Sequence, residues 1–489
     1  MSGETPHVAI IGGGMTGVAA AFFLQETARE QGRPLAVTVI EASGRLGGKV
    51  LTDRVDGFFI EAGPDSFLAR KPWARQLAER VGLGDDLVPT DPRHRHTFVL
   101  GRGRLHPIPE GLFMFVPVRL GAFARTRLIS PWGKARMALE PLVPKGPEGD
   151  ETIAAFVTRR AGREALERLA EPLLTGIYSG RADRLSILST FPQLKEMEQR
   201  AGSLWKGFMS GPRAQAGGGS AFLSLRGGLD SLVQAVARRL DAVTVRTGVK
   251  VTRLALADAA AAPGEPKAPA GAGRDRYRLA LSDGTYVAAD AVIVATPAFA
   301  AADLIEPICP EAAPHLRAIR FVSTITCVLG YNRADLQHPL NGSGFLVPRK
   351  EGRPITACTW VSSKWAHAAR PDQALIRCYL GRDGEQEVMG WSDDKVVAAV
   401  RNELRELMGI TAAPQLVRVY RWERAMPQYE VGHRERVAAI ERAVAKRPGI
   451  VLAGASYHGV GVPDCVRQGQ QAAERVLLLI SEKDGMTPA

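Results

Sequence analysis

The chain has 489 residues, of which 45% are hydrophobic and 23% charged, a composition typical of a globular protein with room for two or three lobes. The formal net charge is +12, and because no recognisable nucleic-acid module accompanies it, no nucleic-acid partner is predicted. The five cysteines form no C-x-x-C pair, which argues against a disulfide framework and a zinc site, and no metal is predicted.

A glycine-rich turn follows the first predicted strand, residues 7–11, and precedes a predicted helix. Gly12 permits a tight turn, Gly14 lets the backbone approach a pyrophosphate, and Gly17 lets helix and strand pack closely. A second predicted strand ends at Glu41, whose carboxylate can accept hydrogen bonds from ribose hydroxyls. This order of elements predicts a dinucleotide site.

Residues 92–182 are predicted to form a mainly helical lobe that carries much of the positive charge. Lys and Arg side chains between residues 93 and 136 flank the apolar segment Leu112–Val118. A basic surface with apolar residues fits an anionic membrane, an acidic substrate, or a solvated face around a core segment. The sequence leaves these three interpretations open.

Three separate pieces of the chain are predicted to build one discontinuous cofactor domain, because each carries short apolar strands of the buried, parallel type. The pieces are residues 1–91, 222–300 and 415–489. Residues 183–221 and 301–414 are assigned to a substrate-binding domain. Residues 255–273 are almost entirely Ala, Pro and Gly with a few charges, and this composition predicts a disordered insertion.

Motifs along the whole chain resemble those of the porphyrinogen-oxidising flavoenzymes of haem biosynthesis, in the protoporphyrinogen oxidase superfamily. They are Arg45–Lys49, Glu61–Leu68, Glu171–Gly180, Met426–Tyr429, Gly432–His433 and Gly459–Cys465. Ile355–Trp360, with Lys364–Ala369 after it, is most similar to the coproporphyrin-forming, Gram-positive-type coproporphyrinogen III oxidases. The resemblance implies an α/β fold with an FAD-binding, Rossmann-like domain of the glycine-doublet type, a substrate domain and a mainly helical lobe.

The same resemblance implies a set of cofactor and substrate contacts. The FAD contacts are Gly12, Gly13, Gly14, Met15, Thr16, Gly17, Glu41, Ala42, Gly48, Gly63, Pro64, Asp65, Ser66, Val251, Trp422, Val460, Gly461 and Val462. The substrate contacts are Thr175, Gly176, Ile177 and Tyr178. Because Thr97 stands where protoporphyrinogen-type members have an arginine, Arg70 and Lys71 are the candidate anchors for substrate carboxylates.

The activity implied by the resemblance is the six-electron oxidation of coproporphyrinogen III to coproporphyrin III, with FAD as cofactor, O2 as acceptor and H2O2 as by-product. No catalytic base is assigned, because the flavin performs the redox step. Protoporphyrinogen IX oxidation is the nearest alternative. A flavin amine oxidase, a carotenoid desaturase and a non-catalytic binding protein on the same scaffold are further alternatives.

The first residues have neither a basic head nor an apolar core, so a cytoplasmic protein is expected. The glycine cluster interrupts the uncharged segment Val8–Gln25, so no transmembrane helix is predicted. Phe113–Phe115 have three candidate contacts, namely the inner face of a membrane, a partner such as a ferrochelatase, or the substrate channel. The sequence does not choose among them.

Overall fold

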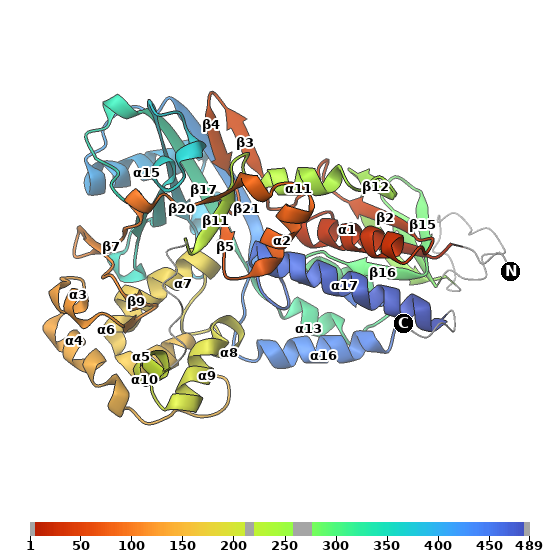
Figure 1. Ribbon diagram of the computed structural model, residues 1–489, viewed down its shortest axis with the longest axis horizontal. Helices are drawn as coiled ribbons and strands as arrows, with labels where there is room; N and C mark the ends of the chain where they lie inside the picture. The colour runs from red at the N-terminus through yellow and green to blue at the C-terminus, as the bar shows by residue number, and fades with distance from the viewer. Residues whose placement is uncertain (1–4, 211–219, 258–275, 484–489) are drawn as a thin grey trace.

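The computed structural model describes residues 5–210, 220–257 and 276–483. Figure 1 shows a parallel sheet flanked by long helices at one end, a large mixed sheet at the upper left, and a group of short helices below it. Both ends of the described chain lie at the end of the molecule formed by the parallel sheet (Figure 1). The two sheets and the helical group are described in turn.

The parallel sheet draws its five strands from all three predicted cofactor pieces. Its order is β12-β2-β1-β16-β22, with β1 at His7–Ile11, β2 at Ala36–Glu41, β12 at Val243–Thr247, β16 at Ala291–Val294 and β22 at Ile450–Leu452. One face is covered by α1 (Met15–Glu30), α2 (Pro72–Arg80), α11 (Asp230–Ala237) and α17 (Val462–Lys483). The strands β1, β2 and β16 bury nearly every side chain, which explains their continuous apolar sequences, whereas the edge strand β12 is mostly exposed.

A three-stranded antiparallel sheet and three helices cover the opposite face. They are β13 (Val251–Leu256), β14 (Tyr277–Leu281), β15 (Tyr286–Ala289), α12 (Ala298–Ile305), α13 (Ala313–Arg317) and α16 (His433–Ala445). Ala255 and Leu256 do not belong to the disordered insertion expected at 255–273, because they pair with Arg278 and Tyr277 in the sheet. Residues 258–273 lie outside the described residues.

The second large sheet has seven strands in the order β21-β17-β20-β19-β18-β7-β8. Its strands are β7 (Thr97–Gly101), β8 (Arg104–Pro107), β17 (Phe321–Asn332), β18 (Gly344–Leu346), β19 (Ile355–Trp360), β20 (Gln373–Leu380) and β21 (Leu416–Pro427). The helix α15 (Asp393–Met408) packs on one face through its apolar stripe. The other face carries Trp422 and Arg377, which contact the backbone at Ala62 and Gly63 in the cofactor domain.

Two predicted boundaries differ from the structure at this sheet. Residues 415–427 were assigned to the cofactor domain, but they form β21, which pairs with β17 along most of its length. Residues 97–107 were assigned to the helical lobe, but they form β7 and β8 of the same sheet. Strand pairing between distant segments decides both boundaries, and apolar periodicity alone carries no information about the pairing partner.

The helical lobe is built from short helices between residues 120 and 210, so residues 183–210 extend it rather than the substrate domain. It contains α3 (Leu120–Arg125), α4 (Pro131–Ala138), α5 (Ile153–Ala161), α6 (Arg163–Ala165), α7 (Glu171–Tyr178), α8 (Ile187–Thr190), α9 (Pro192–Ala201) and α10 (Leu204–Ser210). Between α6 and α7 the chain forms a wider helical turn at Leu166–Ala170. Phe115 is 1% exposed and packs in the lobe core, which agrees with the interpretation of a core segment bordered by a solvated basic face.

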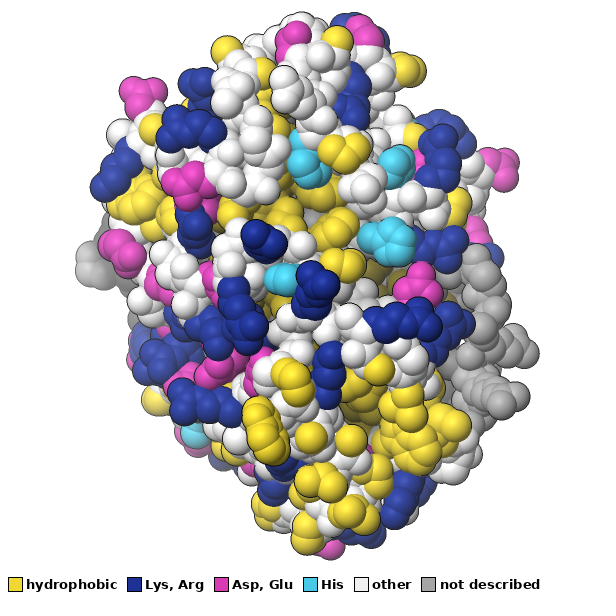
Figure 2. Space-filling model, turned by 90° about the vertical axis from the view of Figure 1, so that its left-hand side faces the viewer, with side chains coloured by type: hydrophobic (Ala, Val, Ile, Leu, Met, Phe, Trp, Pro, Cys, Tyr) yellow, Lys and Arg dark blue, Asp and Glu magenta, His cyan; other side chains and the backbone are white. Residues whose placement is uncertain are grey.

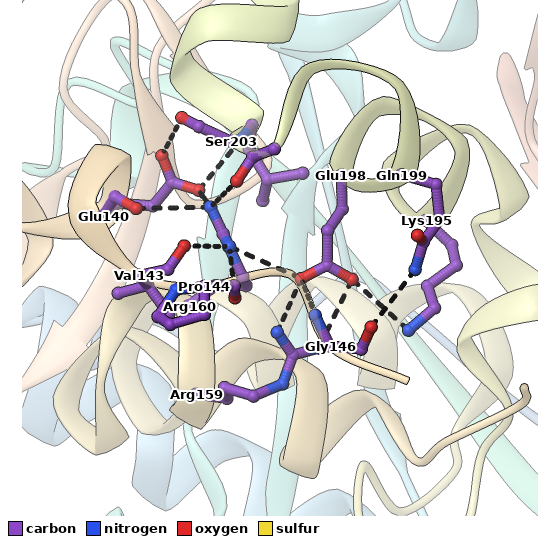
Figure 3. Close-up of polar contacts among 12 residues, drawn as sticks. Glu140, Val143, Pro144, Gly146, Arg159, Arg160, Lys195, Glu198, Gln199 and Ser203 are labelled. Carbon is purple, nitrogen blue, oxygen red and sulfur yellow. Dashed lines mark hydrogen bonds and ion pairs between the residues drawn. The ribbon is translucent and has the colours of Figure 1, made fainter. Parts of the chain in front are cut away.

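A buried ion cluster holds these short helices together (Figure 3). The Glu198 carboxylate, fully buried, accepts a 2.5 Å hydrogen bond from Arg159 and lies 3.3 Å from the Lys195 ammonium. Arg160, also fully buried, bridges to Glu140, which accepts hydrogen bonds from Ser203 and the backbone of Leu204. Because the charges are paired and hydrogen-bonded, burying them here is tolerated.

The remaining short elements lie outside the two large sheets. They are β3 (Thr52–Val55), β4 (Phe58–Glu61), β5 (Phe67–Leu68), β6 (Leu87–Pro89), β9 (Leu112–Phe113), β10 (Val116–Pro117), β11 (Phe222–Leu225) and α14 (Val361–Lys364). The strand β11 pairs with both β5 and β6, so residues near 220 return the chain to the cofactor side.

Candidate flavin and substrate site

The turn between β1 and α1 forms an anion-binding helix end. Gly14 is the N-cap of α1 and no side chain caps the helix, so its first backbone N–H groups are available to a ligand. A Cβ placed on Gly14 would meet no atom within 4 Å, whereas a Cβ on Gly17 would lie 1.8 Å from the Gly12 carbonyl oxygen. The open side at Gly14 and the close packing at Gly17 match the roles predicted for both glycines. Met15 and Thr16 begin the helix and are buried.

Glu41 ends β2 beside this turn. Its Oε2 accepts a 2.7 Å hydrogen bond from the Gly13 backbone N–H, and its Oε1 accepts one of 2.8 Å from Ser43. The backbone of Val249 donates to the Glu41 carbonyl, which brings the start of β13, including Val251, to the same end of the sheet. Ala42 is exposed at this end. The predicted ribose and adenine contacts are therefore neighbours in space.

Gly48 and Gly63 bring two further backbone segments close to the turn. A Cβ on Gly48 would lie 3.1 Å from the Cα of Gly14, and a Cβ on Gly63 would lie 1.8 Å from the Lys49 carbonyl oxygen. Trp422 donates a 2.8 Å hydrogen bond from Nε1 to the Ala62 carbonyl oxygen. These contacts place the predicted cofactor residues Gly48 and Gly63 of the first domain close to Gly14 and to Trp422 of β21.

Asp65, in the predicted cofactor segment 63–66, is surrounded by donors. Its Oδ2 accepts a 2.9 Å hydrogen bond from Lys364 and one of 3.3 Å from Trp365, and its Oδ1 accepts one of 2.7 Å from Ser66. Burial raises the pKa of Asp65, but the positive charges of Lys364 and Arg377 outweigh it, and the net pKa lies below its usual range. Asp65 is therefore a fixed anion, and Pro64 and Ser66 hold its segment in place.

The N-terminus of α17 forms the opposite wall. Val460 and Gly461 precede the helix and Val462 begins it, so their N–H groups lie at its positive end. Asp464 accepts a 3.3 Å hydrogen bond from the Gly461 backbone and pairs with Lys71, whose ammonium lies 2.6 Å from its Oδ2. Lys71, predicted as a substrate anchor, thus already has a partner in the structure, and its role as an anchor stays a prediction.

The predicted substrate residues lie on α7 and in the loop before α2. Thr175 and Tyr178 are buried, whereas Gly176 and Ile177 are exposed, and Ile177 retains 45% of its accessible surface. Arg70 is exposed, and no ion pair or hydrogen bond of its side chain is found within the described residues. The exposed tip of α7 is therefore the part of this group open to a ligand.

Four side chains that the sequence analysis did not single out complete the site. They are Lys49, Thr296, Lys364 and Arg377. Lys49 donates to the Ala425 carbonyl oxygen, and burial lowers its pKa from the ordinary value. Arg377 donates to the Gly63 carbonyl oxygen. A charged residue inside the apolar run Ala374–Leu380 was the sequence signal for Arg377, because a buried strand rarely carries one without a function.

Unpartnered polar atoms test whether a flavin dinucleotide fits. Thr296 Oγ1 and Thr175 Oγ1 are buried and have no hydrogen-bond partner among the described residues. The Thr296 side chain lies close to Gly12, because a Cβ added there would be 3.4 Å from its Cγ2. An uncapped helix end, an open side at Gly14, an acid for the ribose and an orphaned hydroxyl fit a phosphate-bearing dinucleotide.

The described residues contain neither a membrane-spanning helix nor a metal-binding cluster. Within the described residues, no helix combines the length and apolar character needed to cross a bilayer. The same residues contain no group of three or more His, Cys, Asp or Glu side chains arranged to hold a metal ion.

Comparison with known proteins defines the class of the protein. The family model for flavin containing amine oxidoreductases matches residues 15–477. The chain therefore belongs to this family, and it is a flavin-dependent oxidoreductase. The predicted α/β fold class and the predicted flavin cofactor are confirmed at this level.

Individual relatives show which members of the family the chain is most similar to among those compared. Coproporphyrinogen III oxidase from Bacillus subtilis (strain 168) is 38% identical over 485 residues, which cover 98% of this chain and 99% of that protein. The protein of the same name from Staphylococcus aureus is 33% identical, covering 97% and 99%. A crystal structure of a protoporphyrinogen oxidase-like protein from Exiguobacterium sp. 255-15 superposes with a TM-score of 0.83 at 35% identity, covering 97% and 99%. The predicted resemblance is confirmed.

Proposed function

We propose that the protein oxidises coproporphyrinogen III to coproporphyrin III. The proposal rests on sequence identities of 38% and 33% to two coproporphyrinogen III oxidases. The matches extend over nearly the whole chain and include the substrate lobe. The reaction removes six electrons and six protons from the macrocycle and reduces three O2 to three H2O2. The carboxylates of the substrate match the basic side chains around the predicted cofactor residues, where Lys49 and Arg377 donate to backbone carbonyl oxygens and Lys71 and Lys364 pair with aspartates.

We also propose that the flavin is FAD rather than FMN. The support is the β1–α1 turn together with Glu41 and the backbone before Val251, which offer contacts to a second nucleotide that FMN lacks. A bound flavin supplies the redox chemistry, because it accepts two electrons from the substrate in each round and passes them to O2.

The chain's own residues bind, orient and shield the reactants. The N–H groups at the start of α17 favour negative charge beside them. The half-buried Gly63 and Trp422 limit access of water. No side chain is needed as a base, since protons leaving a porphyrinogen can pass to water.

The alternatives differ in the substrate. Protoporphyrinogen IX shares the flavin site, and protoporphyrinogen oxidase 1 of Spinacia oleracea is 28% identical to the chain over 501 residues. An amine substrate is disfavoured, because its ammonium would enter a site that already holds Arg377 and Lys49. A neutral amine would also find few acceptors, since Asp65 and Asp464 are each paired with a lysine.

The test compares the two porphyrinogens and a set of amines. Each porphyrinogen, reduced anaerobically, is mixed in air with the purified protein, and porphyrin fluorescence and H2O2 are followed after subtraction of autoxidation. We expect faster turnover of the tetracarboxylate with about three H2O2 for each porphyrin. Faster turnover of protoporphyrinogen IX, or H2O2 formed from amines alone, would contradict the proposal.

A surface patch supports a second proposal, peripheral contact with an anionic membrane. Trp132 is 87% exposed, Leu142 77% and Leu120 59%, all in the helical lobe. Arg119, Arg125 and Arg127 are exposed nearby in the sequence. Figure 2 shows hydrophobic side chains gathered on the lower part of this face with Lys and Arg beside them. Apolar side chains with a basic border match a negatively charged lipid surface.

Sedimentation with vesicles tests the contact. The protein should bind vesicles with anionic lipid and not neutral ones, less at high salt, and Trp132→Ser should weaken binding. Leu478→Ser, at a 49% exposed position on α17, is the control. Equal binding by wild type and Trp132→Ser would contradict the proposal. The ferrochelatase partner stays a prediction.

A further inference from the structure

Arg377 is a buried cation with unused hydrogen-bond donors. The side chain, on β20, is 4% exposed, and its Nη2 donates to the Gly63 carbonyl oxygen. Its Nε and Nη1 have no hydrogen-bond partner among the described residues. Buried donors of this kind are rare in folded proteins and point to a ligand that the protein is built to receive.

No carboxylate pairs directly with Arg377 among the described residues, although its positive charge acts at longer range on the buried carboxyl groups of Asp65 and Glu61. Asp65 is the nearest acid in the segment that Arg377 contacts, and its carboxylate pairs at 2.9 Å with Lys364. Arg377 itself makes no ion pair with any described residue. A guanidinium does not lose its proton in a protein, so its burial is unfavourable until an anion compensates the charge.

The neighbours of Arg377 form a polar wall suited to a carboxylate. The guanidinium carbon lies 4.8 Å from the ring centre of Tyr379, two residues along the same strand, a distance at which the ring attracts the positive charge. The Tyr379 hydroxyl lies 3.4 Å from Thr359 Oγ1 on the adjacent strand β19, and both side chains are partly exposed. A planar fork beside two hydroxyl groups recognises a carboxylate better than it recognises a single point charge.

The position of Arg377 in the fold places these polar side chains beside the predicted cofactor residues. The strand β20 alternates between the two faces of the seven-stranded sheet, and Ile376 and Cys378 pack toward α15. Arg377 therefore lies on the face turned to the cofactor domain, where it contacts Gly63. An anion bound by Arg377 would lie beside the flavin segment 63–66.

We propose that Arg377 is a substrate-binding residue that receives a carboxylate of the porphyrinogen. The inference rests on the proposed function, because that function supplies a substrate with carboxylates. It adds an anchor that the sequence analysis did not identify. Of the two anchors it did propose, Lys71 is paired with Asp464 and Arg70 lies at the surface.

The test is a binding titration of coproporphyrin III, the stable product, into the purified flavin-loaded protein, followed by fluorescence quenching. For Arg377→Gln we expect the porphyrin Kd to rise about 10- to 100-fold, since a charge-assisted hydrogen bond to the ligand is lost. Arg377→Lys, which keeps the charge but not the fork, should lie between wild type and Arg377→Gln. The flavin Kd, measured by ultrafiltration, should remain that of the wild type.

The control is Arg317→Gln, which removes an exposed arginine of α13 that pairs with Asp303 and Glu306. It should bind porphyrin as the wild type does. Should Arg377→Gln fail to fold, a raised porphyrin Kd of Arg377→Lys supports the proposal and an unchanged one overturns it.

Three outcomes distinguish an error in the assignment of Arg377 from an error in the proposed function. A wild-type porphyrin Kd in Arg377→Gln overturns the assignment of Arg377. The same result with a raised flavin Kd shows that the guanidinium holds the flavin instead, and it also overturns the assignment. A wild-type protein that neither binds coproporphyrin III nor oxidises its porphyrinogen overturns the proposed function itself, whatever the variants do.

Discussion

The ammonium of Lys71 lies 2.7 and 2.6 Å from the two carboxylate oxygens of Asp464, which joins the loop before α2 to the first turn of α17 across 393 residues of sequence. Asp464 is 5% exposed and also accepts a hydrogen bond from the Gly461 backbone. The pair is therefore a nearly neutral unit at the helix end where the flavin is proposed to bind.

Breaking this pair from either side should move the flavin reduction potential in opposite directions. Lys71→Ala leaves an uncompensated carboxylate and should lower the midpoint potential, whereas Asp464→Asn leaves the ammonium and should raise it. A shift of about 30 mV corresponds to about 1.4 kcal/mol for a two-electron couple. Spectroelectrochemistry of the purified variants measures it.

The double variant is the control, and its potential should return toward the wild-type value because both charges are gone. A Lys71→Ala protein with an unchanged potential and a raised KM for coproporphyrinogen III would contradict this prediction. That result would support the sequence-based assignment of Lys71 as a substrate anchor.

Gly63→Ala should impair flavin binding, because its Cβ would lie 1.8 Å from the Lys49 carbonyl oxygen and the backbone must move. We expect the flavin Kd to rise at least about tenfold, which corresponds to about 1.4 kcal/mol. Gly390→Ala is the matched control, since its Cβ meets no atom within 4 Å. Ultrafiltration of flavin-loaded protein gives both constants, and equal constants would refute the steric argument.

Glu198→Gln should destabilise the helical lobe by about 3 kcal/mol, because three cations lose a buried counter-charge (Figure 3). Faster thermolysin cleavage within residues 140–210 and a lower urea midpoint measure the loss. Glu311→Gln, which breaks only the exposed pair with Lys446, should leave both unchanged. A Glu198→Gln protein as resistant as the wild type would mean that apolar packing alone holds the lobe.

His433 should make stability depend on pH below neutrality. Burial lowers its pKa from the ordinary 6.5 to about 4, and its ring stacks on Tyr429 at 4.0 Å. At pH values between these two pKa values, the His433 side chain is protonated in the unfolded chain and neutral in the folded chain. The free energy of unfolding therefore falls as the pH falls, by at most about 3 kcal/mol.

Urea unfolding at pH 7.5 and pH 5 measures this dependence. His433→Gln, whose amide can still donate to the Tyr457 carbonyl oxygen, should lose less stability than the wild type between the two pH values. An equal loss in both proteins would assign the pH dependence to other groups.

The sequence predicted the local parts of the site well. The strand His7–Ile11 has its predicted ends, because an apolar run and the glycine-rich turn after it mark them locally. The close packing at Gly12 and Gly17 agrees with the expected need for glycine, since a Cβ at either position would meet a backbone oxygen, whereas the contact of Gly14 with a pyrophosphate stays a prediction.

The sequence could not predict which distant segments meet. The pairing of Lys71 with Asp464, and that of Arg377 with Gly63, joins residues hundreds of positions apart, and only the folded topology brings them together. The same limitation explains why β21 was assigned to the cofactor domain. Charge inside an apolar run marks a residue as unusual, but it does not say what the residue contacts.

The path of the chain through the cofactor sheet also fixes when the protein can fold during its synthesis. The helix α1 near the start packs along α17 at the end, so closely that a Cβ on Gly469 would lie 2.5 Å from the Thr16 carbonyl oxygen. At ~5–20 residues per second, the ribosome needs some tens of seconds to supply α17 after α1 has emerged. Throughout that time the apolar face of α1 lacks the cover that α17 gives it in the folded protein. We therefore expect the proposed flavin site, one wall of which is the start of α17, to be completed only after α17 has been synthesised.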